Sequence, residues 1–213
     1  MIRRSLVVVL LLLWGSFPAF SQEMKKEGGI PKGQFTFAPG AELLYRSYEK
    51  GSFLGDTYTM GLGYRLKMDF EFSGYPGIGL YFGTQGSSIQ SNRFLGGFFK
   101  EVRMPETGIY LFHQIPVFEN LTLRGELGYG QLQVIHGLSP SRFILDFAHF
   151  SGGLVANYTL AKEVLGIFDL NLIVGGNYGF LNGNKIVIND LDRTYVQRST
   201  AVQGVFGIKV RYL

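Results

Sequence analysis

Hydrophobic and polar side chains alternate with a period of two along most of the chain from Gln34 onward. In the clearest stretch, Thr57 to Phe72, every even position is apolar and every odd position is small, polar or charged. Side chains of a β-strand point alternately to opposite faces, so this stretch predicts a strand with one wholly apolar face. Because no helical stripe competes with the alternation, the pattern predicts an all-β fold.

The same alternation recurs in eight segments, which we interpret as eight strands. They cover residues 34–48, 57–72, 77–88, 107–115, 120–135, 144–160, 166–181 and 198–213. The fourth strand is the least regular, because Ile109 to Phe112 is apolar on both faces. In the fifth strand the apolar positions change phase near Gly128 to Gly130, which predicts a β-bulge there.

The connections between these strands alternate in length. The short ones are residues 73–76, 116–119 and 161–165, and the longer ones are residues 49–56, 89–106, 136–143 and 182–197. An even number of strands, with short turns on one side and longer loops on the other, is typical of bacterial outer-membrane barrels. We therefore predict a transmembrane antiparallel up-and-down β-barrel over residues 34–213.

A soluble secreted barrel is the alternative, and it would carry its apolar face inside. The polar face of this chain is rich in glycine rather than in lysine and glutamate, at Gly61, Gly63, Gly79, Gly83, Gly175, Gly179 and Gly207. The apolar face carries large residues on nearly every strand, which are too bulky for the interior of eight strands. Both features favour large side chains facing lipid, and small ones making room for charged residues inside.

The N-terminus has the features of a cleaved export signal. Arg3 and Arg4 precede a nine-residue apolar run from Leu6 to Trp14, and Ala19 and Ser21 suit a signal peptidase. An uncleaved membrane anchor would need about 20 apolar residues, so this run is too short. We expect residues 1–21 to be a signal peptide and residues 22–33 to be a flexible periplasmic leader.

Composition narrows the function. Charged residues make up 17% of the 213 residues, and removing Arg3 and Arg4 with the signal leaves 18 basic against 16 acidic residues. This balance offers no basic face for nucleic acid. The absence of cysteine excludes disulfides, thiolate metal sites, cysteine nucleophiles and a lipid-modified N-terminal cysteine. We expect no cofactor.

The inward face of the predicted barrel carries eleven charged residues. They are Glu42, Arg46, Arg65, Lys67, Asp69, Glu71, Arg124, Glu126, Asp169, Lys209 and Arg211. Buried charges persist when they are paired, and eight strands leave an interior just wide enough for side chains to fill. We interpret this set as a salt-bridged plug, with a narrow ion or proton path as the alternative.

At this level the chain resembles the small eight-stranded outer-membrane proteins of the OmpA-barrel and OmpX-like group. The resemblance covers residues 34–213 and rests on strand number, loop asymmetry and the closing strand from Val205 to Leu213. Such chains usually end on an aromatic residue, whereas here Tyr212 is followed by Leu213. The resemblance implies structural, adhesive or complex-forming roles rather than catalysis.

One short motif points to an enzyme instead. The segment His149-Phe150-Ser151 resembles the His-x-Ser motif of PagL-like lipid A deacylases, and Glu163 follows Ser151 at that family's spacing. The family's asparagine after the serine is Gly152 here, and its motif lies near the C-terminus rather than on a sixth strand. With Glu163 in a periplasmic turn, about 40 Å of extended chain separates it from Ser151, too far for a triad.

Two outward loops carry further candidate sites. The second long loop contains Phe94, Leu95, Phe98 and Phe99, which would pack over the barrel mouth, extend strands or contact a partner. The last long loop contains Asn189 to Asp192, which lacks an EF-hand pattern and which we expect to be a solvated loop. His113 and His136 are isolated and predict no metal site.

The sequence thus predicts an integral outer-membrane protein of a Gram-negative bacterium with a structural, surface-interaction or complex-subunit role. Its expected partners are outer-membrane lipid and lipopolysaccharide, the barrel-assembly machinery during biogenesis, and a protein partner at the outward loops. A narrow channel and a lipid A deacylase-like hydrolase using His149 and Ser151 are the alternatives.

Overall fold

The fold is known from a computed structural model. It describes residues 35–72, 75–91, 99, 101–137, 142–183 and 192–212. The predicted signal peptide and leader lie outside these residues.

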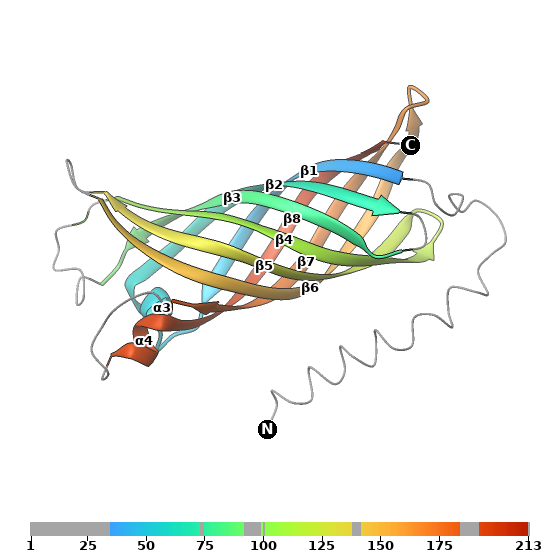
Figure 1. The fold of residues 1–213 in the computed structure, drawn as a ribbon. Helices are drawn as coiled ribbons and strands as arrows, with labels where there is room; N and C mark the ends of the chain where they lie inside the picture. Colours follow the sequence, from blue (N-terminus) through green and yellow to red (C-terminus); the bar gives the residue numbers. More distant parts are fainter. Residues whose placement is uncertain are drawn as a thin grey trace. The chain divides into compact units, whose positions relative to one another are not determined.

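Eight antiparallel strands form one closed barrel (Figure 1). They are β1 (Phe35–Tyr48), β2 (Tyr58–Phe72), β3 (Gly77–Ile89), β4 (Glu101–Phe118), β5 (Leu121–Gly137), β6 (Arg142–Val164), β7 (Phe168–Asn182) and β8 (Arg198–Tyr212). Each strand pairs with the next in the sequence, and β8 pairs with β1. The predicted all-β up-and-down barrel with eight strands is confirmed.

The strands are strongly staggered around the barrel. Cα partners followed from Phe37 through β2 to β8 lead back to Ser47, ten residues further along β1. Such a stagger requires strands tilted by roughly 40° to the barrel axis. It also makes the interior so narrow that side chains alone can fill it.

A band of apolar side chains surrounds the barrel. Leu43, Leu66, Leu111, Leu154 and Phe206 are among its exposed members. Aromatic residues lie near both edges of the band: Tyr45, Tyr64, Tyr129 and Tyr178 on the outer side, and Phe35, Phe72, Tyr158 and Tyr212 on the inner side. About ten residues of a tilted strand span the hydrocarbon. The apolar face therefore points outward, as a membrane barrel requires and a soluble barrel forbids.

No helix among the described residues is long and apolar enough to cross a membrane.

The polarity of the wall reverses beyond the outer edge of this band. On β5, Leu127 and Tyr129 face outward with Glu126 inside, but two residues later Gln131 faces outward while Leu132 and Val134 are fully buried. The pairing of β5 with both neighbours runs through Gly128 to Gly130 without a register shift. The predicted bulge is therefore wrong. The phase change in the sequence marks the strand leaving the membrane, where water replaces lipid outside and an apolar core replaces charge inside.

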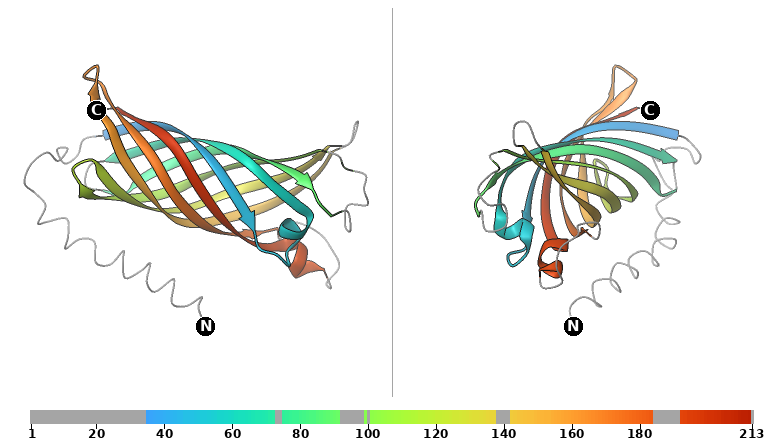
Figure 2. Two further views of the ribbon diagram at one scale, coloured as in Figure 1. Left: turned by 180° about the vertical axis from the view of Figure 1, so that it is seen from behind. Right: turned by 60° about the vertical axis from the view of Figure 1, so that its left-hand side comes forward.

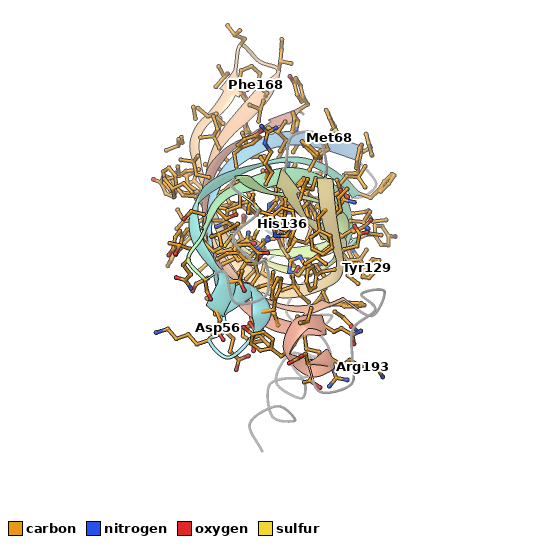
Figure 3. The ribbon with its side chains drawn as sticks, turned by 90° about the vertical axis from the view of Figure 1, so that its left-hand side faces the viewer. Asp56, Met68, Tyr129, His136, Phe168 and Arg193 are labelled. Carbon is orange, nitrogen blue, oxygen red and sulfur yellow. The ribbon has the colours of Figure 1, made fainter. Side chains whose placement is uncertain are left out.

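This outer part of the barrel holds an apolar cluster, which we call the outer apolar layer. It contains Tyr48, Phe53, Leu54, Tyr58, Val102, Met104, Leu132, Val134, Leu145, Phe147, Leu181, Val196 and Ala201. Two short helices, α3 (Phe53–Thr57) and α4 (Arg193–Gln197), contribute to the layer. Figure 3 looks onto this end and shows Asp56 and Arg193 at its rim and His136 within the ring of strands.

A real bulge lies between Met60 and Gly63, where the pairing of β2 with β3 shifts register. It turns Tyr58 into the outer apolar layer and leaves Met60 packed against the layer, although the alternation placed both on the outward face. It also leaves Gly61 exposed rather than inside. The uninterrupted strand predicted from Thr57 is thus wrong at its outer end, and Thr57 belongs to α3.

Most predicted strand ends are correct to within about two residues, but β4 begins at Glu101 rather than 107 and ends at Phe118. The predicted loop 89–106 is correspondingly shorter, and Glu106 becomes part of the wall. The predicted asymmetry of the connections is confirmed for three of the four outward connections, because the inward ones span two to four residues. The predicted outward loop 136–143 is wrong in length, since only residues 138–141 separate β5 from β6.

Interior glycines make room for large aromatic rings, besides the charged side chains that the glycine-rich polar face predicts. Phe112 lies against Gly77 and Tyr110 against Gly79, so that a Cβ at either glycine would overlap the ring. The outward Gly204, in contrast, has no heavy atom within 4 Å of where a Cβ would stand.

We expect Gly79→Ala to destabilise the barrel by about 1–3 kcal/mol, because the extra methyl group would have to displace the Tyr110 ring. The matched variant Gly204→Ala should change stability little. Urea midpoints followed by the mobility of the folded band on unheated gels measure both. Equal midpoints for the two variants would contradict this packing.

Candidate functional site

The interior of the membrane-spanning part is filled by charged side chains. Near the outer edge of the apolar band, Arg46 of β1 contacts Glu106 of β4 and also donates to the Gln203 side chain at 2.8 Å. Arg65 of β2 lies 2.8 Å from Glu42 and 3.9 Å from the same Glu106. Glu106 thus joins the two arginines across the barrel.

Acidic and basic side chains continue to contact one another in turn toward the periplasmic end of the barrel. Lys67 lies 3.2 Å from Glu42 and 2.8 Å from Glu126 of β5. Arg124 lies 2.8 Å from Glu126 and also contacts Asp69, which Lys209 of β8 approaches at 3.4 Å. One continuous chain of ion pairs, the charge chain, therefore runs through the barrel from Arg46 to Lys209.

The remaining predicted charges lie at the periplasmic mouth. Glu71 and Arg211 pair at 3.4 Å and are partly exposed, and Gln114 donates to Glu71 at 2.7 Å. Asp169 also faces inward but accepts from the backbone N–H of Glu163 at 2.9 Å, at the β6–β7 turn. Ten of the eleven predicted residues thus form ion pairs inside the barrel or at its periplasmic mouth, and Asp169 lies beside the β6–β7 turn.

Sequence reasoning missed Glu106, which is only 3% exposed. The alternation predicts that the fourth strand starts at residue 107, which leaves Glu106 in the preceding loop. The alternation of Val102, Met104, Glu106 and Tyr110, all buried, was the available signal. With Glu106 included, the named interior set holds six acids and six bases, so the charges balance.

Aromatic rings support the cations of the charge chain. The Arg65 guanidinium lies 5.2 Å from the centre of the Tyr81 ring, and the Lys67 ammonium lies 4.4 Å from that of Tyr110. The Arg124 guanidinium lies 3.9 Å from the centre of the Phe112 ring. Cation–π contacts are strongest where water is excluded, so these rings offset part of the cost of burying the cations.

Little space remains between these side chains. A cavity beside the charge chain, lined by Arg65, Lys67, Tyr110, Ser151 and Asn177 among others, has a volume of about 10 Å³. That is room for roughly one water molecule. Neither this cavity nor a second one beside Asp69 and Lys209 has room for a hydrated ion.

The outer apolar layer closes the barrel above the charge chain. Met104, Leu132, Val134 and Phe147 come from three strands and have no exposed surface. An ion leaving the charged interior outward would have to shed its water among these groups, at a high free-energy cost. Within the described part of the chain, the polar interior is therefore closed outward and faces the periplasm.

Of the four apolar residues predicted to pack over the mouth or bind a partner, Phe99 is described. Its ring lies 5.0 Å from that of His136 and 5.8 Å from that of Phe143, and it packs against the outer apolar layer. Phe94, Leu95 and Phe98 lie outside the described residues. The contacts of Phe99 agree with packing over the mouth.

His136 lies within this aromatic group, beyond the membrane band. Its ring nitrogens pair with the Tyr58 hydroxyl and, at 3.3 Å, with the Phe143 carbonyl oxygen. Burial lowers the pKa of His136. The neutral ring can donate from Nδ1 to the carbonyl and accept at Nε2 from Tyr58, so its role is to join three strands rather than to bind metal.

His149 and Ser151 of β6 both face the interior of the barrel, away from lipid. They lean apart, because the His149 ring lies against Gly179 of β7 whereas the Ser151 hydroxyl lies against Gly128 of β5. Glu163 lies at the far end of β6, beside the periplasmic turn. The structure therefore does not assemble these three residues into a hydrolytic triad.

No group of three metal-ligating side chains occurs among the residues the structure describes. Asp192 is the N-cap residue of α4, and residues 189–191 lie outside the described part. His113 lies on β4 opposite Gly125.

Comparison with known proteins finds the same fold without close sequence relatives. No protein family matches the sequence, and no curated protein does. A major outer membrane protein from Thermus thermophilus aligns with a TM-score of 0.54 at 12% identity, over 84% of this chain and 99% of that one. Neisserial surface protein A aligns with a TM-score of 0.51 at 9% identity, over 84% and 96% of the two chains.

The N-terminal β-barrel domain of Pseudomonas aeruginosa OprF aligns with a TM-score of 0.50 at 11% identity, over 84% and 99% of the two chains. These similarities concern the arrangement of the strands. Together with the closed eight-stranded topology and the outward apolar band, they establish the fold of this chain as that of the small outer-membrane β-barrels.

We expect Glu106→Leu to destabilise the barrel by about 3–5 kcal/mol, because it leaves the buried Arg46 without a carboxylate partner. Arg46→Met should cost less, because Arg65 still lies 3.9 Å from Glu106. The double variant should recover most of that loss, since an apolar pair of similar size replaces the ion pair. Urea unfolding in lipid vesicles measures the coupling as a double-mutant cycle.

Removing the exposed Glu119–Lys162 pair by Glu119→Gln is the control, and it should have little effect. Additive losses in the double variant would contradict a direct Arg46–Glu106 pair.

Proposed function

We propose that the protein is a non-enzymatic component of the outer membrane of a Gram-negative bacterium, with a surface-interaction or complex-subunit role. The supporting observation is the extension of the barrel beyond its apolar band. There the outer apolar layer, α3 and α4 make a rigid platform from which the outward loops are displayed. Rigid scaffolds that position variable loops are a common basis for recognition.

The contacts at the rim of this platform favour a fixed display. The Ser52 hydroxyl hydrogen-bonds that of Ser199 at 2.9 Å, and Phe53 of α3 packs against Tyr195 of α4. These contacts link the segment before β2 to α4 and to the start of β8. Loops anchored in this way lose less conformational entropy on binding a partner.

The proposed partners follow from location. The apolar band is suited to outer-membrane lipid, and the polar outward positions beyond it would lie among lipopolysaccharide headgroups. The closing strand β8 would be recognised by the barrel-assembly machinery during biogenesis. Export through a signal peptide at residues 1–21, followed by a leader at residues 22–33, remains part of this proposal. One of the similar structures is named a surface protein, which is compatible with such a role.

Partner binding is tested by varying the second outward loop. We expect Phe94→Ser with Phe98→Ser to abolish co-purification of a surface partner while leaving the folded band on gels unchanged. The matched control is Ser88→Ala on β3, an exposed position just before this loop. Retention of the same partner by variants in all the outward loops would contradict the proposal.

A narrow channel is the second candidate, because the charge chain is continuous along the barrel. The filled interior and the outer apolar layer oppose it. We expect the purified protein in planar bilayers to show no stable unitary current at neutral pH. A steady, reproducible open state would favour the channel and count against a sealed barrel.

A further inference from the structure

At the periplasmic end β6 extends beyond its neighbour β5, whereas β7 stays paired with β8 as far as Phe168 opposite Tyr212. Pairing of β6 with β5 ends at Tyr158 opposite Leu121, just before the Thr159 N–H donates to the Asn120 carbonyl oxygen at 2.8 Å. The strand nevertheless continues to Val164, paired with β7 alone. Figures 1 and 2 show this hairpin projecting past the rim of the barrel near the C-terminus.

The tilt of the strands determines where this projection leads. A hairpin that continues a strongly tilted strand leaves the cylinder of the wall along a tangent. Its tip then lies beside the barrel rather than beneath its mouth. The right-hand view of Figure 2 shows the hairpin projecting from the barrel, with the C-terminal end of β8 beside it.

The tip is apolar and exposed. Leu165 is 84% exposed, and Leu160 and Ile167 are also exposed. At the end of β4, just before the adjacent β4–β5 turn, Phe118 is 72% exposed and Val117 is exposed beside it. We call these five residues the tip patch. The ion pair of Lys162 with Glu119, at 3.1 Å, ties the two turns together.

The backbone holds Leu165 at the end of the hairpin despite an unfavourable conformation. Leu165 has a φ of 56° and Glu163 a φ of 50°, in the left-handed region that glycine and asparagine prefer. The Gly166 N–H donates to the Glu163 carbonyl oxygen at 2.8 Å, which closes the turn. A turn in water would gain from a polar residue at position 165, whereas this turn presents leucine.

The tip patch is continuous with the apolar band. Leu160 follows the exposed Tyr158 on the outward face of β6, and Phe118 follows the band on β4. Lys162 and Glu163 lie between the apolar residues, so the tip is amphipathic. Long lysine side chains can keep their stems in an apolar environment while the ammonium reaches lipid phosphates.

We propose that the tip patch inserts into the inner leaflet of the membrane beside the barrel. The surface of the protein in contact with lipid then extends deeper on the side of β4 to β7 than on the side of β1 to β3. Lys162 meets the headgroups, and the β6–β7 hairpin holds the barrel against that leaflet. The occupant of the tip patch is therefore lipid.

Spin labels test this directly, because the chain has no cysteine and single cysteines can be labelled cleanly. The mature chain is folded into vesicles of phosphatidylethanolamine and phosphatidylglycerol with Leu165→Cys or Phe118→Cys. Lys50→Cys, in an exposed outward turn, is the aqueous control, and Leu66→Cys, in the apolar band, is the lipid control. Oxygen, which partitions into lipid, and a nickel chelate, which stays in water, are the two relaxation agents.

Insertion predicts that labels at positions 165 and 118 show a high ratio of oxygen to nickel relaxation, close to that at position 66. Adding Ile167→Ser and Leu160→Ser should shift the ratio at position 118 toward that at position 50, with the folded band on gels retained. If Leu165→Cys does not fold, Ile167→Cys takes its place. Ratios at 165 and 118 equal to that at position 50 would overturn the proposal and leave the tip patch to a periplasmic protein.

Discussion

The narrow interior of an eight-stranded barrel is the constraint on which the rest of the structure depends. Inside hydrocarbon there is no room for water to solvate a cation, so every inward charge needs a partner from another strand. The charge chain meets this need by sharing, since Glu42, Glu106, Glu126 and Asp69 each contact two cations. Glycine opposite Tyr110 and Phe112 follows from the same lack of space.

Each long strand passes from lipid in the membrane into water outside it. Where the wall passes through lipid, its outer face is apolar and its inner face charged, and above the membrane both faces exchange character. A strand such as β5 can make this change without altering its hydrogen bonding, because only the identity of alternate side chains changes. The upper barrel is thus organised like a soluble protein, stabilised by burial of Leu132, Val134 and Phe147 rather than by ion pairs.

Much of this architecture is readable from the sequence, because alternation reports directly which face of a strand each residue occupies. It predicts the inward face for the ten charged residues that the ion pairs join. Two predictions about bulges were wrong. On β5, the change from lipid to water outside the barrel shifts the apolar positions in the way a bulge would. On β2, the bulge beside Met60 leaves the apolar alternation in the sequence unchanged, so the sequence does not reveal it. Glu106 was missed because the apolar character of β4 is similar on both faces. The overshoot of β6 depends on pairing with β5, which no local pattern reveals.

The connectivity of the charge chain bears on how the barrel is assembled. Asp69 of β2 contacts Arg124 of β5 and Lys209 of β8, and Arg46 of β1 bonds to Gln203 of β8. An open sheet that entered the bilayer before its last strand joined the first would carry these groups into hydrocarbon short of partners. We therefore expect membrane insertion and barrel closure to be coupled. A sheet whose first and last strands have not yet paired would be kept out of the lipid by its unpaired charged side chains.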